Sequence, residues 1–182
     1  MIRRRTWILA TLAAGLVLSL AGLSAYAHWL LSQPKEEPDG WQTIAWPFPR
    51  DGWPPGKAWR GHGLEVYIRP KLGFCGNCDT GVVEDSEVDR VTDIDLLDEK
   101  FTPLQDGKRI QITDLVGRAR LYRLNMRGGE RTALGIAVNY KCDLIVAIVL
   151  GNMTDAATAG VARSFLESDK VQFWVNQQLE DR

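Results

Sequence analysis

The sequence predicts an α+β domain in which C-terminal helices cover one face of an antiparallel sheet, preceded by an N-terminal transmembrane helix and a strap rich in Trp and Pro. Three observations lead to this prediction. An apolar run near the N-terminus is long enough to cross a bilayer. Several segments with the two-residue period of strands follow it. After residue 153 the apolar period lengthens to that of helices, and strands followed by helices are typical of α+β domains.

The apolar run identifies residues 6–32 as a transmembrane helix or an uncleaved signal anchor. No charged residue occurs between Arg5 and Lys35. Residues 7–31 give about 37 Å of helix at 1.5 Å per residue, enough to cross a bilayer. Because three arginines immediately precede the run, the positive-inside rule keeps the basic stub of residues 1–5 in the cytoplasm and exports the rest.

A cleaved secretory signal peptide is the alternative. Ala25-Tyr26-Ala27 matches an A-x-A cleavage site after a basic region and an apolar core. The retained anchor is favoured because the run stays apolar through Leu31, where a mature N-terminus is usually polar. Both interpretations export the domain. The retained anchor predicts a single-pass protein of the bacterial inner membrane, with its C-terminal domain in the periplasm.

Composition and charge exclude two classes of protein. The 182 residues are 45% hydrophobic and 25% charged, which is typical of a folded chain rather than a disordered one. Removing the three N-terminal arginines from 22 basic residues leaves 19 against 23 acidic ones, a net charge of −4. Nucleic-acid binders present a basic surface to phosphates, so no nucleic-acid partner is expected.

Residues 33–60 form the strap. Its prolines exclude regular helix and favour turns and extended stretches, as in Trp46-Pro47-Phe48-Pro49. The favoured interpretation is an ordered strap whose aromatic side chains pack on the domain. A peptide-binding or membrane-surface role for the tryptophans is the alternative.

Residues 61–182 form the predicted exported α+β domain. The strands expected from their alternation or apolar character are 64–69, 109–112, 118–126, 132–138 and 144–150. The run 144–150 is apolar at every position, which predicts a central strand covered on both faces. Thr154 or Asp155 is expected to cap a first C-terminal helix, and Ser168 a second.

Cys75-Gly76-Asn77-Cys78 is the sharpest local motif, and three interpretations of it stay open. In an exported protein the two thiols close a small disulfide, with Gly76-Asn77 as its turn. The second interpretation is redox catalysis of the thioredoxin type. Two observations oppose it, because Asp79 disfavours ionisation of a neighbouring thiol and no βαβ pattern surrounds the motif. The third is metal binding, as a structural zinc site or a transient copper site, and it needs more ligands.

Further soft ligands are scarce in the exported part. Cys142 adjoins the apolar run 144–150, where a cysteine is most often a small buried hydrophobe. The sequence therefore favours a Cys75–Cys78 disulfide with Cys142 reduced, and no metal or cofactor. A metal set of Cys75, Cys78, Cys142 and His62 is the alternative.

The stretch 79–99 holds nine acidic residues against one basic residue, Arg90. Asp85, Glu87 and Asp89 alternate as calcium ligands do, and Asp93 and Asp95 continue the alternation, but the loop Gly and closing Glu of an EF-hand are missing. The sequence predicts a solvated acidic surface with a short helix over 86–91 rather than a calcium site.

Sequence motifs for common catalytic mechanisms, such as G-x-S-x-G, H-E-x-x-H and Walker A, do not occur. We therefore expect a non-enzymatic accessory or interaction domain of the envelope, which contacts the membrane through its N-terminal helix and has an envelope protein as partner. The alternative is an exported thiol-redox or metallochaperone protein that uses Cys75 and Cys78.

Two resemblances accompany these expectations. Over residues 109–167 the order of a late hairpin followed by a C-terminal helix resembles the PsbP-type architecture, from which no functional residue carries over. The basic start, apolar span, Trp-Pro strap and Gly73-Phe74-Cys75 stretch resemble small single-pass, membrane-anchored proteins of bacterial envelopes. That resemblance implies a location rather than an activity.

Overall fold

The structure is a computed structural model, and it describes residues 22–24, 26, 40–48, 52–73 and 84–180. The chain divides into two compact units, residues 1–35 and 36–182. The described residues of the first unit are helical. Within the described ranges no helix has both the length and the apolar character that crossing a membrane requires. Most of the predicted span 6–32 lies outside these ranges, so the anchor stays a prediction.

The described part of the second unit contains eight strands, and two helices close it. In chain order its elements are β1 (Gln42–Ile44), β2 (Lys57–Gly61), β3 (Leu64–Lys71), α2 (Asp85–Val91), η1 (Ile94–Leu96), β4 (Thr102–Pro103), β5 (Lys108–Ile112), β6 (Leu115–Met126), β7 (Gly129–Tyr140), β8 (Asp143–Leu150), α3 (Ala156–Leu166) and α4 (Asp169–Glu180).

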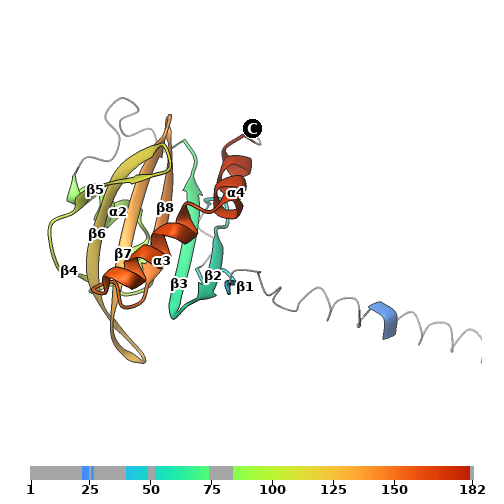
Figure 1. The fold of residues 1–182 in the computed structure, drawn as a ribbon, viewed down its shortest axis with the longest axis horizontal. Helices are drawn as coiled ribbons and strands as arrows, with labels where there is room; N and C mark the ends of the chain where they lie inside the picture. Colours follow the sequence, from blue (N-terminus) through green and yellow to red (C-terminus); the bar gives the residue numbers. More distant parts are fainter. Residues whose placement is uncertain (1–21, 25, 27–39, 49–51, 74–83, 181–182) are drawn as a thin grey trace, which may run out of the picture. The chain divides into compact units, whose positions relative to one another are not determined.

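The described strands form one eight-stranded sheet in the order β1-β2-β3-β8-β7-β6-β4, and β5 also pairs with β6. Every pair is antiparallel. The long β6–β7 hairpin extends below the rest of the sheet in Figure 1. The predicted α+β class, with an antiparallel sheet and C-terminal helices, is confirmed.

Strand β8 is central, as its uninterrupted apolar sequence predicts. It lies between β3 and β7, and all eight of its residues are buried. Val149 faces the core beneath the C-terminal helices. Val146, an odd number of positions away on the same strand, faces the opposite side of the sheet.

The C-terminal helices α3 and α4 cover one face of the sheet (Figure 1). Phe165 of α3 and Val175 of α4 share a core with Val66, Ile68 and Val149 of the sheet. α3 begins where the sequence predicts, because Asp155 accepts hydrogen bonds from the backbone nitrogen of Thr158 at 3.0 Å and from its hydroxyl at 2.7 Å.

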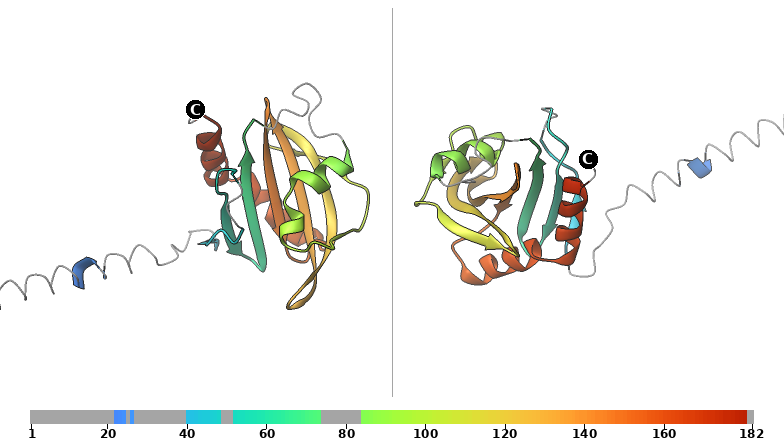
Figure 2. Two further views of the ribbon diagram at one scale, coloured as in Figure 1. Left: turned by 180° about the vertical axis from the view of Figure 1, so that it is seen from behind. Right: turned by 90° about the horizontal axis from the view of Figure 1, so that it is seen from above.

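Helix α2 covers the opposite face (Figure 2). Its two buried residues, Val88 and Val91, pack on Ala137, Leu144 and Val146. The C-terminal helices thus lie on one face, as predicted. The short helix expected over 86–91 forms as α2, but it packs on the sheet, which the sequence did not show because only two of its residues are apolar and buried.

The strap contributes two strands to the sheet. Trp41 and Trp59 are buried in the core beneath α3 and α4, and the Trp41 ring stacks on Phe165 with centroids 3.9 Å apart. Phe48 is buried on the other face. The expected packing of strap aromatics on the domain is confirmed for these residues. Strands β1 and β2 were not predicted, because the prolines of the strap indicated turns and extended stretches.

Candidate functional site

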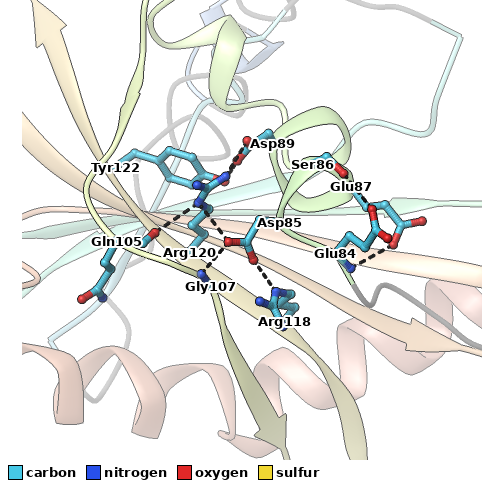
Figure 3. Close-up of polar contacts among 10 residues, drawn as sticks. All are labelled: Glu84, Asp85, Ser86, Glu87, Asp89, Gln105, Gly107, Arg118, Arg120 and Tyr122. Carbon is cyan, nitrogen blue, oxygen red and sulfur yellow. Dashed lines mark hydrogen bonds and ion pairs between the residues drawn. The ribbon is translucent and has the colours of Figure 1, made fainter.

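Three polar clusters of the second unit are candidates for a site, and the first joins α2 to β6 (Figure 3). Asp85 accepts a 2.5 Å bond from Nε of Arg118. Asp89 accepts bonds of 2.7 Å from Nη1 of Arg120 and 2.6 Å from the Tyr122 hydroxyl. These carboxylates therefore bind the sheet, which corrects the expectation of a wholly solvated acidic surface.

The hydrogen bonds of this cluster shift two pKa values in opposite directions. The Gly107 backbone N–H, followed by Arg118, lowers the pKa of Asp85. Burial raises the pKa of Tyr122, and its bond to Asp89 raises it further. Asp85 therefore stays ionised and the Tyr122 phenol stays protonated at neutral pH, so their bonds persist as structural contacts.

The carboxylates that suggested a calcium loop instead cap a helix or pair with cations. Glu87 accepts a hydrogen bond from the backbone nitrogen of Glu84 at 3.2 Å, which completes the capping box of α2. Asp85 and Asp89 bind arginines, and Asp93 lies in a different cluster. Among the described residues, no three His, Cys, Asp or Glu side chains are grouped as metal ligands.

The second cluster is a buried ion triad between β3 and the α2–η1 connection. Asp93 accepts bonds of 2.6 Å from both Nη2 of Arg69 and Nζ of Lys71. The exposed fractions of the three residues are 8%, 1% and 6% respectively. Asp93 has φ = 60°, a left-handed backbone that Asp tolerates better than most residues.

The ion triad is closed to ligands. The Trp46 ring lies over the Arg69 guanidinium at 5.9 Å, and the Trp53 ring lies 6.0 Å from Nζ of Lys71. The space that Trp46 and Phe48 enclose with Arg69 and Asp93 has no room for a water molecule. The triad therefore fixes the strap and the α2–η1 connection to the sheet rather than receiving a ligand.

The third cluster is open to solvent and consists of two adjoining hollows at one end of the sheet, which we call the rim. The first hollow has a volume of about 350 Å³ and the second about 340 Å³. Gly63 and Arg131 line both of them. The remaining lining residues are Gly40, Gln42, Arg60, Gly61, His62, Leu64 and Glu65 for the first, and Glu130, Thr132, Gly151 and Asn152 for the second.

Turn geometry and strand register bring these residues together. His62 and Gly63 form a two-residue turn between β2 and β3, with φ of 52° and 76°, which matches a type I′ hairpin turn. The pairs Gln42–Arg60 and Arg60–Glu65 place three polar residues in one row across β1, β2 and β3. Arg131 enters from β7, beside the end of β8. By strand alternation it lies on the same face as this row.

The electrostatics of the rim centre on Glu65. Nη2 of Arg60 lies 3.1 Å from Oε1 of Glu65, and the hydroxyl of Tyr67 donates to Oε2. Burial raises the pKa of Tyr67, as does its bond to Glu65, whereas the positive charges of Arg60 and Arg131 oppose the rise. The guanidinium groups of Arg60 and Arg131 therefore both lie near the Glu65–Tyr67 pair.

Arg131 differs from the other arginines near it. Its neighbour Glu130 pairs with Arg123 at 3.2 Å instead. In the part of the chain that the structure describes, Arg131 makes no ion pair, although it is half-buried and lines both hollows. A guanidinium group carries five N–H donors, so this position offers a set of donors to an incoming acceptor.

The structure separates two residues that the sequence proposed as joint metal ligands. His62 lies in the β2–β3 turn and Cys142 in the β7–β8 turn. These turns are at opposite ends of β3, whose seven steps span about 23 Å at 3.3 Å per residue. His62 therefore cannot share a metal ion with Cys142, and its Nε2 instead lies close to Gly40, 3.1 Å from where a Cβ would stand.

Cys142 is exposed and disulfide-bonded. The expectation of a buried, reduced thiol is wrong, because Cys142 belongs to the turn that precedes β8 rather than to the buried strand. Cys75 and Cys78 lie outside the described residues, so the predicted bond between them is not tested there. That bond is incompatible with a bond from Cys142 to either of them within one chain.

Comparison with known proteins shows a likeness of fold alone. No protein-family model matches the chain, and no curated protein matches it. The structure is similar to the solution structure of cyanobacterial PsbP (CyanoP) from Synechocystis sp. PCC 6803, with a TM-score of 0.48, 12% sequence identity, and coverage of 70% of this chain and 79% of that chain. This neighbour is of the PsbP type that the order of elements resembled. No ligand, partner or residue role is transferred from it.

Proposed function

We propose that this chain is a membrane-anchored, non-enzymatic domain of the bacterial envelope that acts as an accessory or interaction factor through the rim. The observation that carries the proposal is the position of Arg131, a half-buried guanidinium that lines both hollows and makes no ion pair among the described residues. Open, polar concavities formed by turns are common places for a partner to bind.

The reactive groups of the other polar clusters, and the Tyr67 phenol beside the rim, support this choice because they already stabilise the fold. Asp85 and Asp89 bind arginines of β6, and Asp93 neutralises part of a buried triad. Tyr67 and Tyr122 donate hydrogen bonds to carboxylates, and burial raises the pKa of both phenols, which disfavours their use as nucleophiles or bases.

Site-specific photo-crosslinking in intact cells tests the proposal. A photoreactive residue replaces exposed Asn152 at the rim or, as the control, Phe173 on α4, whose side chain is also exposed. We expect a discrete adduct from position 152 only. The adduct should disappear in the Arg131→Gln background and persist with Arg127→Gln, which removes an exposed charge from the tip of the same hairpin. Equal adducts from both positions, or none from position 152, would contradict the proposal.

The exposed disulfide of Cys142 favours a second candidate, an exported protein of thiol exchange. Exposed disulfides are more easily attacked by a thiolate than buried ones. This candidate predicts that the full chain, purified without reductant, oxidises a small dithiol to its disulfide while the Cys142 disulfide is reduced to two thiols. A Cys142→Ser variant with unchanged exchange activity would exclude Cys142 from the reaction.

A further inference from the structure

The first hollow of the rim combines guanidinium donors, a net positive charge and open space. Among the charged residues that line the first hollow, Arg60 and Arg131 oppose Glu65 alone. The Arg60 side chain is 61% exposed, so its pair with Glu65 leaves other guanidinium N–H groups facing solvent. Exposed pairs of this kind are weak and rearrange readily.

We propose that the rim binds a phosphate group, with Arg131 as its principal donor and Arg60 as the second. The inference rests on the proposed function, since it names the chemical group that the same surface recognises. Guanidinium groups bind phosphate and carboxylate through paired N–H donors. Phosphate fits the rim better than carboxylate because its larger charge and additional oxygens suit two guanidinium groups beside one fixed carboxylate.

The glycines of the rim give such a ligand access to the backbone. Gly63 lines both hollows at φ = 76°, and Gly151 lines the second. A Cβ on Gly151 would stand 2.3 Å from Cδ2 of Leu64, so a side chain at this position would displace the end of the Leu64 side chain. Without side chains at these two positions, the space beside Arg131 stays open.

A phosphate group has two candidate sources, a soluble phosphate compound and the headgroup of an anionic lipid. The second is of interest because Gly40, which lines the first hollow, follows the apolar run ending at Leu31 by only nine positions (40 less 31). The chemistry at Arg131 is the same for both sources, and the experiment separates them.

Protection of arginine from phenylglyoxal tests the inference. The full chain is reconstituted into phosphatidylcholine vesicles, and the modification rates of Arg131 and Arg127 are followed by peptide mass spectrometry. One arm adds inorganic phosphate and another adds chloride at equal ionic strength. A third replaces part of the lipid with phosphatidylglycerol and adds no phosphate.

We expect the modification of Arg131 to slow about tenfold when inorganic phosphate reaches about ten times its Kd, by mass action. Modification of Arg127 should be unchanged, and Arg60→Gln should reduce the protection of Arg131 severalfold. Protection by phosphatidylglycerol without added phosphate assigns the lipid headgroup as a source. Protection by inorganic phosphate alone assigns a soluble compound.

The inference is overturned if neither source protects Arg131, or if Arg131 and Arg127 slow equally, because equal slowing reflects general screening. A rim that still forms the crosslink from position 152 but gives no protection would reject the phosphate group and leave the proposed function standing. Loss of the crosslink from position 152, with Arg131 still protected by phosphate, would reject the proposed function and leave the phosphate site standing.

Discussion

The hydroxyl of Tyr122 on β6 donates a 2.6 Å hydrogen bond to Oδ1 of Asp89 on α2. The other oxygen of Asp89 accepts a bond from Arg120, so one carboxylate is held by two residues of the same strand. Tyr122 is fully buried. Through this contact a short acidic helix is held against the sheet, with its two valines over the core.

The same bond predicts how the domain responds to alkaline pH. Burial, followed by the bond to Asp89, raises the pKa of Tyr122 above its ordinary value of 10.0. The folded state then holds this proton more tightly than the unfolded state does, so its contribution to stability is complete below pH 10 and declines as the pH rises further. We expect Tyr122→Phe to flatten this decline in part, because the pKa of Tyr67 shifts in the same direction. Urea unfolding between about pH 9 and about pH 12 measures the slope. Equal slopes for the variant and the wild type would contradict the assignment.

The buried triad predicts a large cost for a conservative substitution. Asp93→Asn keeps the size of the side chain and tolerates the left-handed backbone at φ = 60°. It leaves Arg69 and Lys71 as two buried cations without their carboxylate, which should lower the free energy of unfolding by about 3–5 kcal/mol. The control is Glu167→Gln, which breaks an exposed pair with Arg163 and should cost about 0.5 kcal/mol or less. Similar losses in the two variants would show that the triad is solvated.

Much of the fold could be predicted because strand and helix periods were clear in the sequence. The run 144–150 predicted the central strand β8, and Asp155 predicted the start of α3. β1 and β2 were missed because they lie between prolines and are only three and five residues long. Their pairing depends on β3, so local sequence could not show it.

The rim was predicted less well than the fold. The sequence identified His62 as a candidate ligand but gave no reason to connect it with Arg131, which lies 69 positions later (131 less 62) and joins it only through the register of β3, β8 and β7. Cys142 was expected to be buried because it adjoins a buried strand, but it lies in a turn at 141–142 and is exposed. Charge pairs such as Asp85 with Arg118 could not be predicted from the sequence, because they depend on how distant segments pack.

The two faces of β8 predict different responses to a buried carboxylate. Val149 is fully buried among apolar side chains beneath α3 and α4, so Val149→Asp buries an unpaired charge and should abolish folding. Val146 stands directly opposite Arg69 on β3 and lines the same small space as Arg69 and Asp93. Val146→Asp should therefore lose about 1–3 kcal/mol less stability than Val149→Asp, because the new carboxylate has a cation beside it. Thermal unfolding of both variants decides, and a Val149→Asp variant at least as stable as Val146→Asp would refute this account of the two faces.

The disulfide of Cys142 predicts the thiol content of the exported protein. The chain has three cysteines, so within one chain only Cys75 or Cys78 can be its partner, and one thiol is left over. We expect one alkylated cysteine per unreduced chain and a cross-linked peptide containing Cys142 in the digest. A peptide in which Cys75 and Cys78 are joined, with Cys142 alkylated, would instead establish the bond that the motif suggested.

Membrane retention of the intact chain tests the central claim most directly. Envelopes from cells that express the full chain are washed at alkaline pH, and the pellet and supernatant are analysed by intact mass and by protease added from the periplasmic side. The account predicts a chain in the pellet that retains residues 1–27 and loses its C-terminal domain to the protease. A soluble chain that begins at His28 would contradict it, because the apolar run would then be a cleaved signal rather than an anchor.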